Sequence, residues 1–211
     1  MVAILTGDIA DSRKLKNQDE WLVPLKELFS ETEGSYPMKW EIYRGDSFQA
    51  EISNPEEALM TALRIKAAIK SIKAEKLDVR IAIGIGRKEY QGERITESNG
   101  EAYINSGEKF ERLKKEGHML GIKTPWPDFD REMNLMIRLA LIAMDAWTVG
   151  AAEAMKVTLQ RPGLTQQEIS RLLGLSQPSV SERQKRAHMT EILEMEAWYR
   201  EKIHPLIAAS K

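Results

Sequence analysis

The segment 54–86 reads NPEEALMTALRIKAAIKSIKAEKLDVRIAIGIG and joins a helix signal to a strand signal. Its first residues are typical of a helix start, because Asn54 can cap the first turn, Pro55 fits the first helical position and Glu57 stands at the capping-box position. Apolar residues then recur at helical spacing along one face. From position 78 to 86 they alternate with period two instead, which predicts a strand.

Three more strands and one helix are predicted before this segment. The strands are Val2–Leu5, Tyr36–Arg44 and Ser47–Ile52, with a helix around Trp21–Phe29 and a hairpin turn at Gly45-Asp46. With the segment 54–86, the order becomes strand, helix, strand, strand, helix, strand. This is the order of the split βαβ, or ferredoxin-like, arrangement, so the sequence predicts an α+β fold.

The rest of the chain is predicted to be mainly helical. A helix through Lys114 and an edge strand near Met119–Lys123 complete the sheet domain. Two prolines in Pro125–Asp128 then interrupt regular structure, because each restricts its own backbone and that of the residue before it. We therefore predict a sheet domain over residues 1–127 and an all-α domain over residues 128–211. The helices expected in the second domain span residues 131–159, 165–173, 177–190 and 191–203.

The composition is that of an ordinary folded protein. The 211 residues are 42% hydrophobic and 30% charged, which is too apolar for a disordered chain. There is no cysteine, so disulfides and thiolate metal sites are excluded. The first residues lack the basic leader of a signal peptide, and the most apolar later stretch, Met133–Trp147, is interrupted by charged residues. We expect a cytoplasmic protein without membrane contact.

The net charge of −1 gives the whole chain no overall attraction to nucleic acid, so any such contact must come from a local segment. The segment Leu164–His188 has the pattern of a DNA-binding element. Thr165 and Glu168 form a capping pair at the start of a helix, and Gly174 supplies a turn. Ser176 then caps a second helix. Two short helices joined in this way are typical of a helix-turn-helix, whose second helix enters the major groove of DNA.

The outward face of the second helix would present polar and basic side chains to DNA. The segment has four basic and two acidic residues, a surplus of +2. A helical hairpin used for dimerisation remains the alternative, and Leu193, Ala197 and Trp198 of the last helix are the candidate homodimer face. The expected DNA contacts are Gln177, Ser179 and Ser181 near base edges and Arg183, Lys185 and Arg186 near phosphates.

Two aspartates of the sheet domain are candidates for a metal site. Asp8 follows the first strand and Asp46 lies in the hairpin, and in a split βαβ sheet these positions meet at one edge. Two carboxylates and a backbone carbonyl, here that of Ile9, suit Mg²⁺ or Mn²⁺. Ser12, Arg13 and Lys14 could hold the phosphates of a nucleotide. The alternative is that Gly-Asp pairs only shape turns.

Four motifs in order resemble the SatD-like family of bacterial proteins and, more broadly, the class III nucleotidyl cyclase and polymerase-palm superfamily. They are Gly7-Asp8-Ile9, Gly45-Asp46-Ser47-Phe48-Gln49, the strand Arg80–Gly86 and Asn99-Gly100-Glu101-Ala102. The resemblance covers Val2 to about Leu113. It implies a palm-like domain that binds a metal-nucleotide, followed by a helix-turn-helix. In Arg80–Gly86, we read Gly84 and Gly86 as sites of close backbone packing in a buried strand.

The same resemblance names two more nucleotide-binding candidates and a departure from the cyclase pattern. Cyclases place an Asn and an Arg at helical spacing, and Asn105 and Lys109 stand in the corresponding segment, with lysine replacing arginine. Ser47 also stands where an acidic residue is common. We therefore expect a DNA-binding regulator whose palm-like domain senses a nucleotide. The alternatives are a Mg²⁺-dependent nucleotidyl cyclase or related phosphoryl-transfer enzyme, and a protein-protein adaptor.

Overall fold

The computed structural model of the chain describes residues 1–12, 17–34, 36–43, 45–73, 77–90, 92 and 94–210. Its centre is a five-stranded mixed sheet with the strand order β2-β3-β1-β4-β5. Neighbouring strands are antiparallel except β4 and β5, which are parallel. The prediction that the first and third strands are antiparallel neighbours is confirmed. The strands are β1 (Val2–Ala10), β2 (Met38–Tyr43), β3 (Ser47–Ile52), β4 (Asp78–Gly86) and β5 (Leu120–Lys123).

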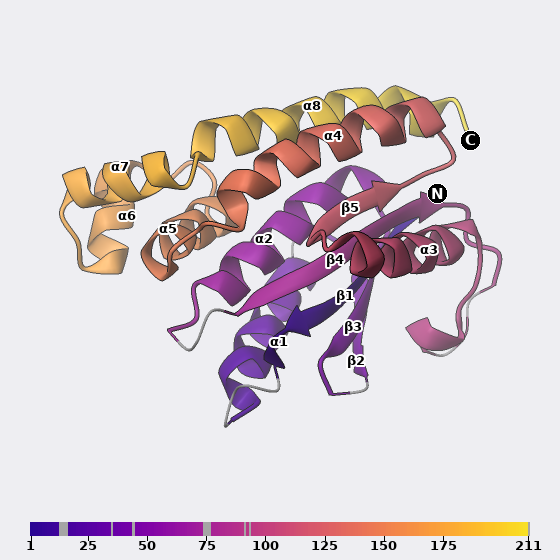
Figure 1. Ribbon diagram of the computed structural model, residues 1–211, viewed down its shortest axis with the longest axis horizontal. Helices are drawn as coiled ribbons and strands as arrows, with labels where there is room; N and C mark the ends of the chain where they lie inside the picture. Colours follow the sequence, from indigo (N-terminus) through magenta and orange to yellow (C-terminus); the bar gives the residue numbers. More distant parts are fainter. Residues whose placement is uncertain are drawn as a thin grey trace.

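Eight α-helices in the described part of the chain make the protein α+β (Figure 1). Two short 3₁₀ turns, Pro55–Glu57 and Ile95–Glu97, precede α2 and α3. The helices are α1 (Asp19–Glu33), α2 (Ala58–Lys70), α3 (Glu101–Glu116), α4 (Pro127–Met144), α5 (Val149–Gln160), α6 (Gln166–Leu173), α7 (Gln177–Arg186) and α8 (Met189–Ala208).

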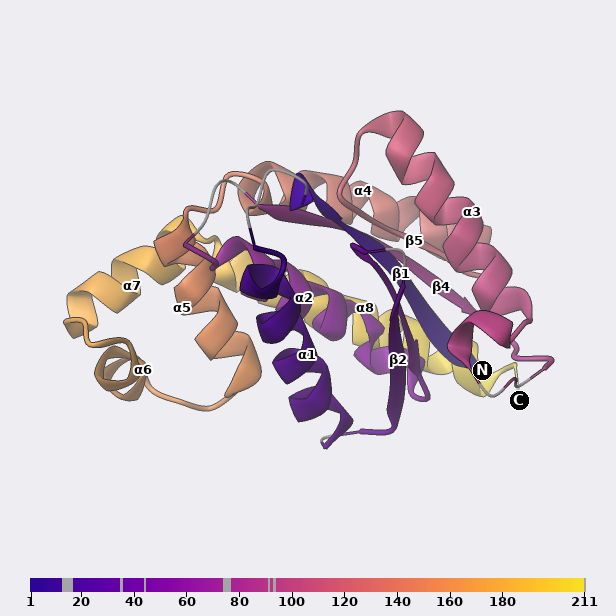
Figure 2. The ribbon, with the colours of Figure 1, turned by 90° about the horizontal axis from the view of Figure 1, so that it is seen from below.

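The two faces of the sheet are covered differently, with α1 and α2 on one side and α3 on the other (Figure 2). Helix α3 lies very close to β4. A methyl group added at Gly84 would come within 2.2 Å of the backbone nitrogen of Ser106, and one at Gly86 within 2.7 Å of that of Ala102. The prediction that these glycines are sites of close backbone packing is confirmed, because no larger side chain fits between strand and helix.

The hydrophobic core continues across the predicted domain boundary. Phe129 and Met133 of α4 and Tyr199 of α8 belong to the same buried cluster as Leu59 of α2 and the strands. The Tyr199 hydroxyl also donates to the carbonyl of Pro55 at 2.5 Å. Helices α4 and α8 run side by side over α2 (Figure 1). The sheet and the helical segment therefore share one core.

Ion pairs reinforce this junction. The Arg200 guanidinium donates to both carboxylate oxygens of Glu57, at 2.6 and 2.8 Å. The Lys66 ammonium is almost fully buried and lies 2.8 Å from carboxylate oxygens of both Asp78 and Asp145. Because a buried ammonium needs compensating charge, Asp145 fixes the end of α4 against α2.

The single helix predicted over residues 131–159 is wrong, since the chain breaks between α4 and α5. Thr148 has an extended backbone and its hydroxyl accepts from the amide of Ala151, so it caps a new helix. The indole of the preceding Trp147 donates to the carbonyl of Ala187 at 2.9 Å. Hydrophobic periodicity missed the break because Trp147 is apolar and buried, as a residue in a continuous helix would be.

Helices α6 and α7 lie at one end of the molecule, on α5 (Figures 1 and 2). Their buried apolar residues Ile169 and Val180 stand outside the shared core cluster, which reaches this region only at Ala187. Among the described residues, no helix combines the length and the apolarity needed to cross a membrane.

Candidate functional site

The caps and the turn of the α6–α7 pair are those that the sequence predicts. The Thr165 hydroxyl accepts from the amide of Glu168 at 3.3 Å, and the Glu168 carboxylate accepts from the amide of Thr165 at 2.8 Å. Gly174 ends α6 with φ +64°, a conformation that favours glycine. The Ser176 hydroxyl accepts from the amide of Ser179 at 3.3 Å and so caps α7. These local bonds fix the angle at which α7 leaves the turn.

Helix α7 has one buried and one exposed face. The buried face consists of Val180, Gln184 and the C-cap residue Ala187. Four of the six expected DNA contacts, Gln177, Ser179, Lys185 and Arg186, are exposed, and Ser181 is half-buried beside them. The first turn of α7 thus carries the small polar side chains, and its last turn carries the basic ones.

Arg183 lies where the sequence interpretation did not place it. Its guanidinium bonds to the Glu153 carboxylate of α5 at 2.7 Å and packs over Gly150. The side chain is 29% exposed, so most of it is withdrawn from the outer face. Arg186 is exposed but bonds to Glu182 at 3.0 Å. The expectation that Arg183 lies near phosphates does not fit this arrangement, because Glu153 already neutralises it.

A chain of side-chain amides links the two helices to α5, and sequence analysis missed it. The Gln177 amide donates to Gln166, Gln166 donates to Gln184, and Gln184 donates to the Thr158 hydroxyl, each at 3.0 Å. Thr158 in turn donates to the carbonyl of Ala154 at 2.8 Å. Nothing in the spacing of these residues along the sequence indicates the chain, because it depends on how three helices meet.

Asp8 and Asp46 lie at the same end of the sheet. Asp8 pairs with Ser47 in the strand register, and the amide of Ile9 donates to the carbonyl of Asp46 at 3.0 Å. The Ser12 hydroxyl donates to the Asp46 carboxylate at 2.6 Å. Four of the predicted site residues therefore come together, while Arg13 and Lys14 lie outside the described residues.

Arg80 was not predicted as a site residue, although it begins one of the quoted motifs. It pairs with Asp8 across β1 and β4, and one guanidinium nitrogen lies 3.2 Å from each Asp8 carboxylate oxygen. Burial raises the pKa of Asp8, and the Arg80 charge opposes that rise. The strand register was the signal, since Arg80 stands opposite Asp8 once the two strands are paired.

This arrangement fits a divalent cation poorly. The Arg80 guanidinium already balances the Asp8 carboxylate, and a metal ion would have to compete with it. Among the described residues, no group of three or more His, Cys, Asp or Glu side chains is arranged to hold a metal ion. Two buried atoms near Asp8 have no hydrogen-bond partner, Nε of Arg80 and Oε1 of Gln49. They are polar positions that a bound molecule could satisfy.

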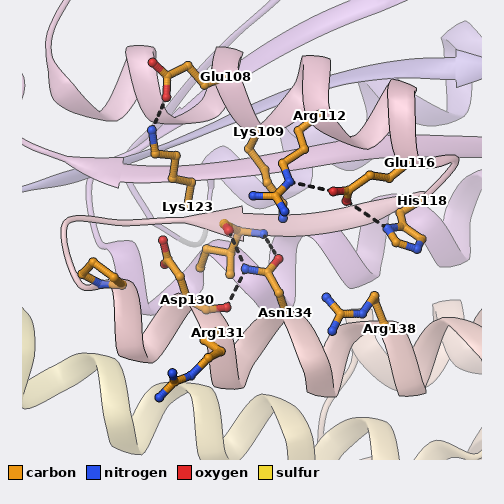
Figure 3. A pocket seen from close by; sticks show the side chains of 12 residues that line it. Glu108, Lys109, Arg112, Glu116, His118, Lys123, Asp130, Arg131, Asn134 and Arg138 are labelled. Atoms are coloured by element: carbon orange, nitrogen blue, oxygen red, sulfur yellow. Dashed lines mark hydrogen bonds and ion pairs between the residues drawn. The ribbon is translucent and has the colours of Figure 1, made fainter.

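The other two nucleotide-binding candidates are not brought to Asp8. The Asn105 amide is buried and donates to the carbonyl of Ile85 at 2.8 Å. Ile85 pairs with Ala3, which is five residues, or about 16 Å, from Asp8 along β1. Asn105 therefore serves the contact between α3 and β4. Lys109 instead lines a pocket beside β5 (Figure 3).

This pocket has a volume of about 680 Å³ and lies between α3, β5 and the start of α4 (Figure 3). Burial and the neighbouring Arg112 lower the pKa of Lys109. Gly121 leaves room for the lysine, whose Cε lies 2.3 Å from where a methyl group would be. Besides His118, the charged side chains of the lining are Glu108, Lys109, Arg112, Glu116, Lys123, Asp130, Arg131 and Arg138.

Most cations of this pocket already have acidic partners. Arg112 bonds to Glu116 at 2.7 Å, and Lys123 bonds to Glu108. The floor is fixed by Asn134, whose amide bonds to both backbone groups of Ile122 on β5 (Figure 3). The pocket is thus a polar surface hollow in which only part of the charge is paired.

No protein-family model matches the chain, and no curated protein sequence is significantly similar to it. The resemblance to the SatD-like family rests on the quoted motifs alone.

Proposed function

We propose that this protein is a cytoplasmic DNA-binding regulator in which α6 and α7 form a helix-turn-helix and α7 enters the major groove. The observation that carries the proposal is the division of α7 into two faces. Its buried face seats it on α5 and α6. Its exposed face offers Gln177 and Ser179 at the N-terminal end and Lys185 and Arg186 at the other. A recognition helix needs this distribution, because its N-terminal residues contact base edges and flanking cations contact phosphates.

Fluorescence anisotropy with the full chain and labelled duplex DNA tests this function. Binding should weaken linearly in a plot of log affinity against log salt, because each phosphate contact releases counterions. Titrations of genomic fragments at two salt concentrations give this slope. If no salt-dependent binding is seen, with or without nucleotides, the protein-protein adaptor becomes the better hypothesis for this protein.

Tight binding to DNA would require a homodimer, since one helix-turn-helix buries little surface. Of the last-helix candidates, Trp198 is half-buried and stacks on Phe129 of α4, so it belongs largely to the monomer. The exposed apolar side chains Leu139 and Ile142 of α4 are better candidates, at 60% and 74% exposure. Light scattering of the wild type and of Leu139→Glu tests a dimer through this face.

For the sheet we propose a ferredoxin-like, palm-type unit that senses a nucleotide. The strand order and the meeting of Asp8 and Asp46 at one sheet end support this, and Arg80 argues against tight metal binding. The second candidate function, a nucleotidyl cyclase or related phosphoryl-transfer enzyme, rests on the same two aspartates. We expect nucleotide binding without turnover. Turnover of a nucleoside triphosphate with Mg²⁺ or Mn²⁺ at about 1 per second or faster would establish the enzyme instead.

A further inference from the structure

The amide chain that ends at Gln177 has a fixed direction. A hydroxyl has one hydrogen, and Thr158 gives it to the carbonyl of Ala154, which can only accept. The Thr158 oxygen must therefore accept from the NH₂ group of Gln184. The Gln184 carbonyl therefore faces Gln166 and accepts from its NH₂ group. The Gln166 carbonyl in turn accepts from the NH₂ group of Gln177. Reversing any one amide would set two donors or two acceptors against each other.

The direction of the chain decides what Gln177 can offer to DNA. One hydrogen of its NH₂ group is committed to the Gln166 carbonyl. The second hydrogen and the Gln177 carbonyl oxygen have no partner within the described residues and lie at the exposed start of α7. Gln177 thus presents one donor and one acceptor side by side.

We propose that Gln177 is a specificity-determining residue that selects adenine over guanine, and that Gln166, Gln184 and Thr158 are positioning residues that enforce this choice. This inference rests on the proposed DNA-binding function. Adenine offers an acceptor, N7, beside a donor, the N6 amino group, which match both groups of Gln177. Guanine offers two acceptors, N7 and O6, and would set O6 against the Gln177 carbonyl.

The positioning residues add discrimination that Gln177 alone would lack. A glutamine free of Gln166 could turn both NH₂ hydrogens toward the two guanine acceptors. Held by Gln166, it has only one to give. The chain also orders the side chain before DNA arrives, so less conformational freedom is lost on binding. Gln184 is 5% exposed and anchors this order inside the helix bundle.

The experiment starts from duplexes selected out of a random library by the full-length wild type, followed by single-base substitution at each position. We expect one position per half-site where adenine is preferred over guanine by about 5- to 150-fold. Gln177→Ala should bring that ratio close to one. Gln166→Met, which keeps the size but removes the amide, should lower it by about two- to tenfold while leaving the salt slope unchanged.

Two further variants give the controls. Gln167→Met alters the exposed neighbouring glutamine, whose side chain is not part of the amide chain. It should keep the adenine-to-guanine affinity ratio of the wild type. Gln166→Glu retains an acceptor for Gln177 but loses the donor to Gln184, so the adenine preference should fall no further than in Gln166→Met, while affinity for every sequence falls. Circular dichroism verifies that each variant is folded.

The outcomes separate the inference from the function on which it rests. If the wild type binds DNA with a normal salt slope but Gln166→Met keeps the full adenine preference, the positioning role is overturned and the regulator stands. A preference for guanine at the Gln177 position overturns the assignment of adenine. If no salt-dependent binding is seen at all, the proposed function and the inference fall together.

Discussion

Two basic side chains of α7, Lys185 and Arg183, have different surroundings. Lys185 is exposed, whereas Arg183 is ion-paired to Glu153 and covers part of α5. We expect Lys185→Ala to weaken binding to all DNA sequences and to lower the salt slope by about one unit. Arg183→Ala should leave the slope nearly unchanged and reduce the stability of the helix pair instead, because it leaves Glu153 without its partner.

Anisotropy titrations at several salt concentrations and urea unfolding of both variants measure these two effects. The double variant Arg183→Ala with Glu153→Ala is the matched control, since it removes both charges and should recover part of the lost stability. A full unit of slope lost in Arg183→Ala would mean that this guanidinium leaves Glu153 to reach a phosphate.

Two glycines, one on β4 and one on α3, give a matched test of packing between these elements. Gly84 has no space for a side chain, whereas Gly107 of α3 has no heavy atom within 4 Å of an added methyl group. Gly84→Ala should lower the free energy of unfolding by at least about 1–3 kcal/mol, because strand and helix must separate. Gly107→Ala should raise it by about 0.5–1 kcal/mol, since alanine is the better helix former.

Thermal and urea unfolding followed by circular dichroism provide both values. Equal effects of the two substitutions would contradict the close contact of α3 with β4.

Sequence patterns predicted most elements, because their signals are local. The alternation in β4, the cap at Thr165 and the turn at Gly174 each depend on a few consecutive residues, and all are found. The break before Thr148 was missed because Trp147 is apolar and fits the helical periodicity, while its hydrogen-bond partner Ala187 lies 40 residues away. Hydrophobic periodicity does not reveal a hydrogen-bond partner that is distant in sequence.

The candidate sites follow the same rule. Asp8 and Asp46 could be brought together from strand order alone. Arg80, the neutralising partner of Asp8, required the register of a third strand. The amide chain ending at Gln177 required the mutual placement of three helices, which no pattern in one sequence encodes.

At the scale of the molecule, the junction between α2 and α8 makes stability depend on pH. The hydrogen bonds from Arg200 lower the pKa of Glu57 below its ordinary value of 4.5. A depressed carboxyl pKa contributes stability that is complete above the unfolded value and is lost as pH falls through the folded one. Glu57→Gln should therefore be less stable than wild type near neutral pH, and the difference should shrink below about pH 4.5.

Urea unfolding at a series of pH values between about 3 and 7 measures this difference. Glu194→Gln, at an exposed position of α8, the helix that carries Arg200, serves as the control and should follow the wild type. A gap between wild type and Glu57→Gln that stays constant down to pH 3 would show that the ion pair with Arg200 contributes nothing.

Because the sheet and helices α4, α5 and α8 share one core, they should unfold in a single transition, with circular dichroism and tryptophan fluorescence giving the same midpoint. The α6–α7 pair is less tightly coupled to that single unfolding transition. Ile169 and Val180 stand outside the core, so the pair can open while the rest stays folded. Its backbone amides should exchange with deuterium well before those of α2. Helices α6 and α7 would then be the least stable part of an otherwise cooperative molecule, and DNA bound to α7 as proposed would slow that exchange.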